Sequence, residues 1–356
     1  MSNKVDYIIV GQGLVGTWIS YYAKAFGKNF IVINDPQTPS ATSVASGVIN
    51  PVTGRRIVQT WMIDVLLPNA LQAYTELGIQ LNKTILKKAP VVLLHPSVQM
   101  KESFEYRLNH DNVYLSPNNK TDWEAFFKTP FGTGQIDSSF WIDLNTMLSS
   151  WRKQLKDLGN YIETYFNIED LIVHQDHVTW KEYTANHIIF CDGNNSMQNK
   201  YFNKLPFAPN KGEALIVEIK GLPKENIYKQ SISIVPWKED LFWVGSNYEW
   251  DFEHLQPTEN FKLKMIEGLN QLLNIPYDIK DHLVGLRPAN KERRPFVGYH
   301  PIQKNVGILN GLGTKGCTLA PFFAAQLIAQ DLNGTPIHPE ANLNRFNELL
   351  SKNGLS

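Results

Sequence analysis

Two glycine-rich segments near opposite ends of the chain contain residue types that suit the binding of a phosphate group. The segments are Gly11-Gln12-Gly13-Leu14-Val15-Gly16 and Gly311-Leu312-Gly313-Thr314-Lys315-Gly316. The first directly follows the apolar run 7–10 and precedes a helix-forming stretch at 17–23. Glycines at this spacing, between a strand and a helix, let a pyrophosphate approach the backbone N–H groups that begin the helix. The first segment therefore predicts a dinucleotide site contacted by Gly11, Gly13, Leu14, Val15 and Gly16.

The residues that follow predict the remainder of a βαβ unit. The helix should end near Gly27, and residues 30–33 are typical of a second buried parallel strand. In such units a side chain about 20 residues past the glycines binds the adenosine ribose. Asn34 and Asp35 occupy that place. The sequence leaves open which of them binds the ribose, with a slight preference for Asp35.

The composition favours a small molecule as the ligand. The chain has 356 residues and balances 34 basic against 34 acidic side chains, so no global field attracts nucleic acid or an anionic membrane. No apolar stretch approaches the roughly 18 residues of a membrane span, and no signal-peptide core precedes the first strand. We expect a cytoplasmic protein with neither a membrane nor a nucleic-acid partner.

The cysteines and histidines indicate neither a disulfide framework nor a metal site. Cys191 and Cys317 are the two cysteines, far apart in the sequence, which fits a reducing compartment. The nine histidines show no HxxH or HExxH spacing. No metal ion is expected.

The order of predicted elements divides the chain into two domains. A helical pattern at 143–158 and strand patterns at 161–166 and 187–191 can rejoin the first βαβ unit, whereas alternating runs at 214–219 and 241–244 favour antiparallel strands. The predicted fold class is α/β with an α+β substrate part. It has a Rossmann-like cofactor-binding domain and an inserted, largely antiparallel β-sheet substrate domain. The first comprises residues 1–60, 144–205 and 283–356, and the second 61–143 and 206–282.

The C-terminal part of the chain resembles the D-amino acid oxidase and glycine oxidase (DAO) family of FAD-dependent oxidoreductases. The resemblance rests on Gly285-Leu286-Arg287-Pro288-Ala289-Asn290-Lys291-Glu292-Arg293-Arg294-Pro295-Phe296-Val297-Gly298 and on residues 311–321. The first glycine segment, residues 45–51 and residues 187–196 also resemble the family, in the expected order. The resemblance extends nearly end to end and implies that the Rossmann-like domain binds FAD.

The resemblance also implies which residues contact FAD. The pyrophosphate would lie at the start of the helix after Gly16, and the second glycine segment would face the flavin edge, where the positive end of the next helix stabilises negative charge on reduced flavin. Residues 285–298 contain no cysteine for covalent attachment, so FAD should be noncovalent. The further expected cofactor contacts are Ser43, Ala45, Ser46, Gly47, Phe166, Asp192, Gly193, Gly311, Gly313, Thr314, Lys315 and Gly316.

Two residues would bind the substrate according to the same resemblance. Arg287 occupies the place of an arginine that forks onto the substrate carboxylate, a geometry that suits guanidinium. Tyr248 would lie beside the substrate side chain, either as an apolar wall of the substrate site or as a hydrogen-bond donor. The pairs Arg55-Arg56 and Arg293-Arg294 are candidates for binding an acidic group and are otherwise typical of a solvated surface.

The implied reaction is oxidation of the C–N bond of an amine or amino acid. A hydride would pass from Cα to flavin N5, giving an imine or oxo product, and oxygen or another acceptor would then take the electrons. Alternatives are a flavin-dependent tRNA-modification oxidase, of which residues 45–51 are reminiscent, a nicotinamide-dependent dehydrogenase, and a flavin-binding protein without turnover. The neutral charge balance weakens the tRNA alternative, and the C-terminal segments argue against nicotinamide.

Overall fold

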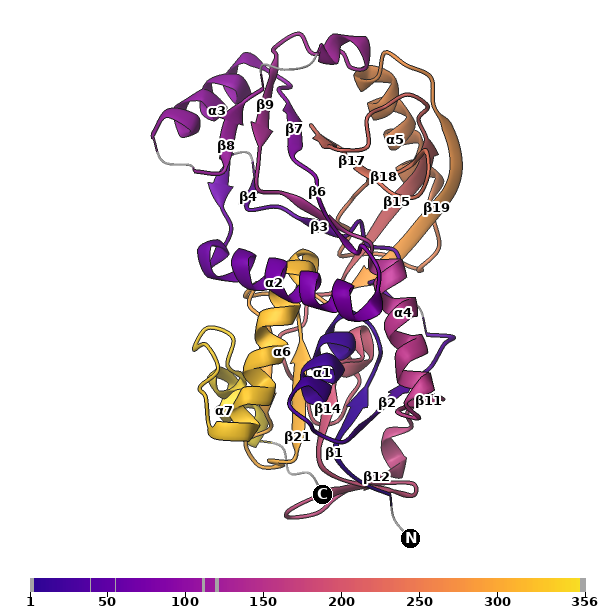
Figure 1. Ribbon diagram of the computed structural model, residues 1–356, viewed down its shortest axis with the longest axis vertical. Helices are drawn as coiled ribbons and strands as arrows, with labels where there is room; N and C mark the ends of the chain where they lie inside the picture. Colours follow the sequence, from indigo (N-terminus) through magenta and orange to yellow (C-terminus); the bar gives the residue numbers. More distant parts are fainter. Residues whose placement is uncertain (1–2, 39, 55, 111–112, 119–121, 353–356) are drawn as a thin grey trace. The chain divides into compact units, whose positions relative to one another are not determined.

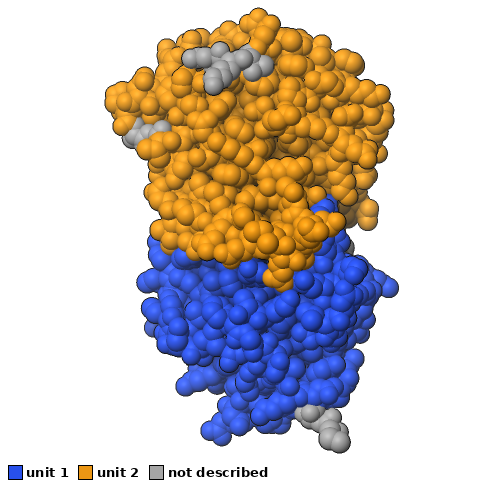
Figure 2. Space-filling model, in the orientation of Figure 1, with its two compact units in different colours: residues 1–43, 144–210, 286–356 blue, residues 44–143, 211–285 orange. Residues whose placement is uncertain are grey.

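The chain forms two compact units in the computed structural model, which describes residues 3–38, 40–54, 56–110, 113–118 and 122–352. Unit 1 comprises residues 1–43, 144–210 and 286–356, and unit 2 comprises residues 44–143 and 211–285 (Figure 2). Both units are therefore assembled from segments that are distant in the sequence. Arg55, one of the candidate arginines, lies outside the described residues.

Unit 1 contains a parallel sheet built around the first strand of the chain. Strand β1 (Asn3–Val10) pairs in parallel with β2 (Phe30–Asn34) on one side and β14 (Tyr183–Phe190) on the other. Strand β11 (Tyr161–Glu163) extends the sheet beside β2, and β21 (Val306–Asn310) pairs in parallel with β14. Strand β2 and the C-terminal ends of β1 and β14 are apolar and buried, as expected for a parallel sheet that is covered on both faces. The predicted Rossmann-like arrangement is confirmed.

Three helices of unit 1 accompany this sheet (Figure 1). Helix α1 (Leu14–Ala25) packs against α4 (Leu144–Asp157) and α6 (Gly316–Asn333). The remaining elements of unit 1 are η2 (Ile168–Asp170), β12 (Leu171–Val173), β13 (Val178–Trp180), η3 (Gly193–Met197), β20 (Phe296–Tyr299), η4 (Gly313–Lys315), η5 (Leu343–Phe346) and α7 (Asn347–Ser351). The starts of α1 and α6 thus coincide with the two glycine segments.

Unit 2 is dominated by a largely antiparallel sheet with the order β19-β15-β18-β17-β16-β7-β9-β8. Strand β15 (Asn210–Glu218) lies between β19 and β18 and alternates between two buried faces. Leu215 and Val217 pack toward α5 (Glu259–Leu272), and Ala214 and Ile216 pack into a second apolar cluster. The other strands are β7 (Val91–Leu94), β8 (Leu115–Pro117), β9 (Thr133–Ile136), β16 (Ile227–Lys229), β17 (Ser233–Pro236), β18 (Leu241–Gly245) and β19 (Asp278–Arg287).

The segment 44–60 belongs to unit 2, whereas the predicted boundary placed it in the cofactor domain. Strand β3 (Val48–Ile49) pairs antiparallel with β10 (Phe140–Ile142), and β10 pairs with β6 (Leu86–Lys88). This pairing ties the segment to unit 2. The remaining elements here are β4 (Val52–Thr53), β5 (Val58–Gln59), α2 (Ile63–Leu81), α3 (Val98–His110) and η1 (Trp123–Ala125).

The helices within the described ranges include none with the length and apolar character needed to cross a membrane. In the same ranges, no group of three or more His, Cys, Asp or Glu side chains is placed to hold a metal ion.

Candidate functional site

The first glycine segment forms a tight turn between β1 and α1. Gly11 has a φ of +97°, and a Cβ built on it would lie 2.7 Å from the carbonyl oxygen of Cys191. A Cβ on Gly16 would lie 1.8 Å from the Gly11 carbonyl oxygen. Only glycine permits this close packing of the turn against β14 and against the start of the helix. Gly13 occupies the N-cap of α1, so the helix begins with backbone N–H groups near a residue that has no side chain.

Asn34 ends β2, and Asp35 directly follows it. The Asn34 Oδ1 atom accepts a hydrogen bond of 2.8 Å from the backbone N–H of Gln12, which couples the end of β2 to the glycine turn. The Asp35 carboxylate accepts hydrogen bonds from Gln37 N at 2.9 Å and from Thr38 Oγ1 at 2.7 Å, and so closes its own turn. Which of the two binds the ribose stays a prediction.

The second glycine segment lies against the first, although about three hundred residues separate them in the sequence. A Cβ on Gly316 would lie 3.0 Å from Leu14 Cδ2, so the starts of α1 and α6 are neighbours within unit 1. Gly311 and Gly313 have φ values of +76° and +55°, which favour glycine. Thr314 is exposed, and the half-buried Lys315 is the N-cap residue of α6. Two positive helix ends therefore converge.

Arg287 ends β19 beside the second glycine segment. The backbone N–H of Gly313 donates to the Pro288 carbonyl at 3.2 Å, which holds the residue after Arg287 against this turn. The Arg287 Nη1 atom donates to Asn210 Oδ1 at 2.8 Å. An amide partner orients the guanidinium without itself adding a negative charge. The candidate carboxylate-binding residue thus adjoins the predicted flavin-edge turn.

Asp192 and Gly193 form a third turn, directly after β14. The Asp192 Cα atom lies 3.0 Å from the position of a Cβ on Gly11, so this turn adjoins the first glycine segment. Asp192 accepts a hydrogen bond from the Ser196 hydroxyl. Burial raises the pKa of the Asp192 carboxyl to about 6, and the hydrogen bond from Ser196 opposes that rise. The turn therefore carries a carboxylate whose charge changes near neutral pH.

Phe166 lies in the apolar core of unit 1. Its ring stacks on Trp180 at a centroid distance of 5.5 Å and meets Phe190 edge to face at 5.7 Å. These contacts account for its burial by packing. Its predicted cofactor contact stays a prediction.

The predicted flavin-lining residues 43–47 span the boundary between the units. Ser43 belongs to unit 1, where its hydroxyl donates to the Ser40 carbonyl at 2.8 Å. Ala45, Ser46 and Gly47 belong to unit 2. Gly47 has a φ of +76°, and a Cβ on it would lie 2.1 Å from the Ile142 carbonyl oxygen. A glycine is thus required at this position by packing within unit 2.

Tyr248 belongs to a segment of unit 2 that is held by the start of β15. Its ring is 51% exposed and stacks on Trp250 at 6.1 Å. The next residue, Glu249, exchanges backbone hydrogen bonds of 2.8 and 3.0 Å with Lys211. Lys211 is itself buried, with its Nζ 3.5 Å from the buried Glu213 carboxylate. The segment of the exposed aromatic pair is therefore hydrogen-bonded to Lys211, a buried residue that is paired with Glu213.

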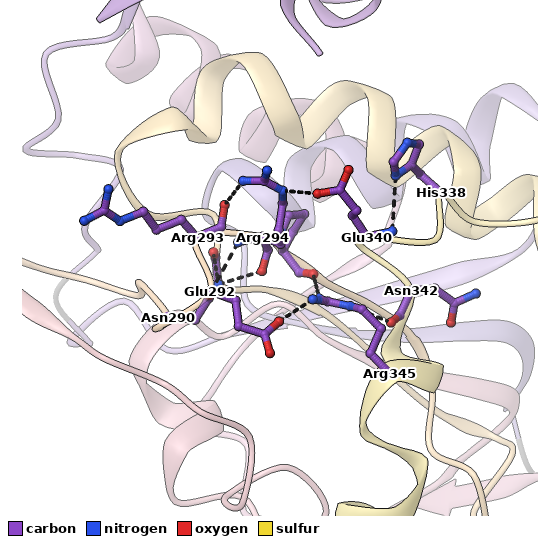
Figure 3. A network of polar contacts seen from close by, with 10 residues as sticks. Asn290, Glu292, Arg293, Arg294, His338, Glu340, Asn342 and Arg345 are labelled. Atoms are coloured by element: carbon purple, nitrogen blue, oxygen red, sulfur yellow. Dashed lines mark hydrogen bonds and ion pairs between the residues drawn. The ribbon is translucent and has the colours of Figure 1, made fainter. Parts of the chain in front are cut away.

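The charged residues after Arg287 make structural contacts, which Figure 3 shows. Arg294 pairs with Glu340 at 2.7 Å, and Arg345 pairs with Glu292 and donates to the Pro295 carbonyl at 3.0 Å. These ion pairs hold residues 292–295 against the C-terminal segment. Of the pair Arg293-Arg294, Arg294 thus has a structural partner.

Three asparagines join these turns, and sequence reasoning missed them. Asn290 donates to the Gly311 carbonyl, Asn310 donates to the Gly193 carbonyl, and Asn194 donates to the Leu286 carbonyl. The one available signal was their position: Asn194 directly follows a glycine turn residue, and Asn310 directly precedes one.

The chain matches the FAD dependent oxidoreductase family, DAO, over residues 6–330. The glycine oxidase of Bacillus subtilis (strain 168) is 23% identical over 345 residues, covering 90% of this chain and 91% of the relative. The structure of glycine oxidase from Geobacillus kaustophilus superposes with a TM-score of 0.76 at 14% identity, covering 94% of this chain and 96% of that one. Iminodiacetate oxidase from Chelativorans sp. BNC1 gives 0.74 at 18% identity, covering 93% and 96%. The two structural likenesses show a shared fold.

Proposed function

Because this chain belongs to the DAO family of FAD-dependent oxidoreductases, its cofactor is FAD, and we propose that it oxidises the C–N bond of an amine or amino acid. The observation that carries this proposal is the convergence of both glycine segments and Arg287 within unit 1. The substrate class is supported by relatives that are named glycine oxidase and iminodiacetate oxidase.

The residues of unit 1 fit noncovalent FAD. The pyrophosphate would lie at the start of α1, where glycine backbone leaves room and the helix dipole favours an anion. Gly311, Gly313 and the start of α6 would hold the flavin edge, with Lys315 adding a positive charge. When bound, FAD would supply the acceptor for the hydride.

Arg287 would bind the substrate carboxylate by two parallel hydrogen bonds from its guanidinium. Asn210 holds Nη1 and so limits rotation of the guanidinium plane. A fixed carboxylate fixes the direction of the Cα–H bond, and orientation of this kind supplies much of the catalysis in reactions that need no strong base. As the hydride leaves Cα and a proton leaves nitrogen, the C–N single bond becomes the C=N bond of an imine. Tyr248 is the second proposed substrate contact.

The first test is an absorption spectrum of the purified protein, before and after acid precipitation. We expect flavin bands that move to the supernatant, followed by bleaching of the holoprotein when an amine or amino acid is added without oxygen. Flavin that stays with the precipitate would contradict noncovalent binding. If no amine bleaches the bound flavin, the result would favour a flavin-binding protein without turnover. The electron acceptor and a cytoplasmic location stay predictions.

Substitution Asp192→Asn should increase FAD affinity at pH 8 by about fivefold, the equivalent of roughly 1 kcal/mol. The Asp192 backbone adjoins the predicted pyrophosphate turn, and the pKa of its carboxyl is raised to about 6, mainly by burial. Its negative charge is therefore present above pH 6, where it repels phosphate, and is lost below. Titration of the apoprotein with FAD at pH 5 to 8 should show the advantage of D192N growing as pH rises.

The matched control is Asp331→Asn. The Asp331 carboxyl also has a raised pKa because of burial, but it accepts hydrogen bonds from Tyr7 and Tyr299 near the other end of α6. D331N should not alter the pH dependence of FAD affinity. Weaker binding by D192N at every pH would contradict the repulsion and indicate that the carboxylate accepts hydrogen bonds from the cofactor.

A further inference from the structure

Three asparagine side chains connect the segment 286–290, the second glycine turn and the Asp192–Gly193 turn in a closed ring. Asn290 Nδ2 donates to Gly311 O at 2.7 Å, and Asn310 Nδ2 donates to Gly193 O at 2.7 Å. Asn194 Nδ2 donates to Leu286 O at 2.6 Å, which returns the ring to the segment that contains Arg287 and Asn290. All these residues belong to unit 1. The ring holds the segment that contains Arg287, the second glycine turn and the Asp192–Gly193 turn in fixed relation to one another.

Asn194 differs from the other two asparagines in its amide oxygen. Asn290 Oδ1 accepts from Arg294 N at 3.3 Å, and Asn310 Oδ1 accepts from Gly311 N at 2.8 Å. Asn194 Oδ1 is buried, and no donor among the residues that the structure describes reaches it. Buried polar atoms in native proteins almost always have a partner, because the loss of water is otherwise uncompensated. This oxygen therefore needs a donor that the described residues do not supply, either an ordered water or a bound ligand.

The orientation of the Asn194 amide is fixed by its other contact. The Leu286 carbonyl oxygen can only accept a hydrogen bond, so the amide nitrogen must face Leu286 and the oxygen must face away. Asn194 directly follows the Asp192–Gly193 turn, which adjoins Gly11, and Leu286 directly precedes Arg287. The unpartnered oxygen thus belongs to the residue that links the Asp192–Gly193 turn to the segment of the predicted carboxylate anchor.

We propose that Asn194 Oδ1 accepts a hydrogen bond from a ligand bound in unit 1, and that this ligand group is a hydroxyl or an ammonium N–H. This inference rests on the proposed function of the three turns. A carboxylate or ionised phosphate offers only acceptors and is excluded as the partner, so Asn194 complements Arg287 instead of duplicating it. The two sources of such a donor are a hydroxyl of the cofactor and the ammonium of an amino acid.

The variants Asn194→Ala and Asn194→Asp separate the two functions of the side chain. Alanine removes the acceptor and the bond to Leu286, whereas aspartate keeps an acceptor and lacks the donor. The control is Asn305→Ala: Asn305 Nδ2 also donates to a backbone carbonyl at 2.7 Å, that of Asn186, in the middle of β14. A general loss of stability would affect N194A and N305A alike.

Two titrations identify the source of the donor. In the first, FAD is added to each apoprotein and the quenching of flavin fluorescence gives the affinity. In the second, glycine or its des-amino analogue acetate is added to each holoprotein, and the flavin absorption is followed without oxygen. We expect N194A to lose about threefold to tenfold in one of them, the range for one neutral hydrogen bond. In the glycine titration N194D should lose less than N194A. In the FAD titration the added carboxylate charge of N194D repels the cofactor phosphates, so only N194A and N305A are compared there.

Each outcome has one meaning. Weaker FAD binding by N194A, but not by N305A, supports a cofactor hydroxyl. If N194A binds FAD and acetate as the unchanged protein does but binds glycine more weakly, the donor is the substrate ammonium. If N194A binds FAD and glycine as the unchanged protein does, or if N194D matches a loss of glycine affinity that N194A shows, the proposed acceptor role is overturned. Failure of the proposed oxidation is recognised separately, because FAD would then bind without being bleached by any amine.

Discussion

Replacing Arg287 with alanine should raise the KM for a carboxylate-bearing amine by about 100-fold, the equivalent of roughly 2.7 kcal/mol. Truncation removes the planar guanidinium that would bind the carboxylate, so the substrate loses both of its hydrogen bonds to Arg287. Flavin content should not change, because the cofactor is assigned to the glycine turns and not to this side chain. The measurement is steady-state kinetics on the substrate that bleaches the flavin, together with the flavin-to-protein absorbance ratio.

Two further variants make the expectation specific. Arg287→Lys keeps the charge and loses the fork, so its KM should lie between those of the alanine variant and the unchanged protein. Arg294→Ala removes an arginine of the same segment, whose guanidinium is already paired with Glu340 at 2.7 Å (Figure 3). R294A should change KM by less than about threefold, since a half-exposed ion pair contributes little.

The kinetics also distinguish anchoring from a remote effect. An amine without a carboxylate should be oxidised equally by R287A and by the unchanged protein. Equal KM values for the carboxylate substrate in both proteins, or equal losses in R287A and R294A, would refute the anchoring role of Arg287.

The first glycine turn could be predicted from sequence because every determinant of it is local. The apolar run that became β1, the spacing of Gly11, Gly13 and Gly16, and the start of α1 lie within about twenty consecutive residues. Periodicity and glycine spacing are sufficient for such a unit. The predicted parallel pairing of residues 30–33 within this βαβ unit is likewise confirmed, since β2 pairs with β1.

The proximity of the two glycine segments could not be derived from local pattern. It depends on β21 pairing with β14 and on α6 packing against α1, and nothing within residues 311–316 encodes either contact. The cofactor-binding role of residues 311–316 was predicted from the family resemblance. The assignment of residues 44–60 differed because β3 has two residues, and a strand of that length has no alternation to detect.

The asparagine ring shows a second limit of sequence reasoning. Asn194 bonds to a carbonyl 92 positions away, and Asn310 bonds to one 117 positions away. Asparagine is common in loops, where its side chain usually bonds to nearby backbone. Long-range hydrogen bonds from side-chain amides therefore cannot be predicted from a single sequence.

Gly13→Ala should lower FAD affinity by about 10-fold to 100-fold and leave the protein folded, since an intruding methyl group in a close-packed contact costs roughly 1–3 kcal/mol. Gly13 is the N-cap residue of α1 with a φ of −84°, which any residue adopts. In the protein itself a Cβ on Gly13 would meet nothing closer than Thr42 Oγ1 at 3.4 Å. The methyl group is thus tolerated by the chain and would occupy space assigned to the pyrophosphate.

Two other glycines of the same βαβ unit separate loss of binding from loss of stability. Gly27 has a φ of +67° and nothing within 4 Å of its Cβ position, so G27A should cost roughly 1–2 kcal/mol of stability and retain FAD. Gly16→Ala places a methyl group 1.8 Å from the Gly11 carbonyl oxygen and should lower both the Tm and FAD affinity. Thermal unfolding of the apoproteins and FAD titration measure the two quantities independently. If G13A bound FAD as tightly as G27A does, the pyrophosphate could not lie at the start of α1, because the added methyl group would then fill empty space.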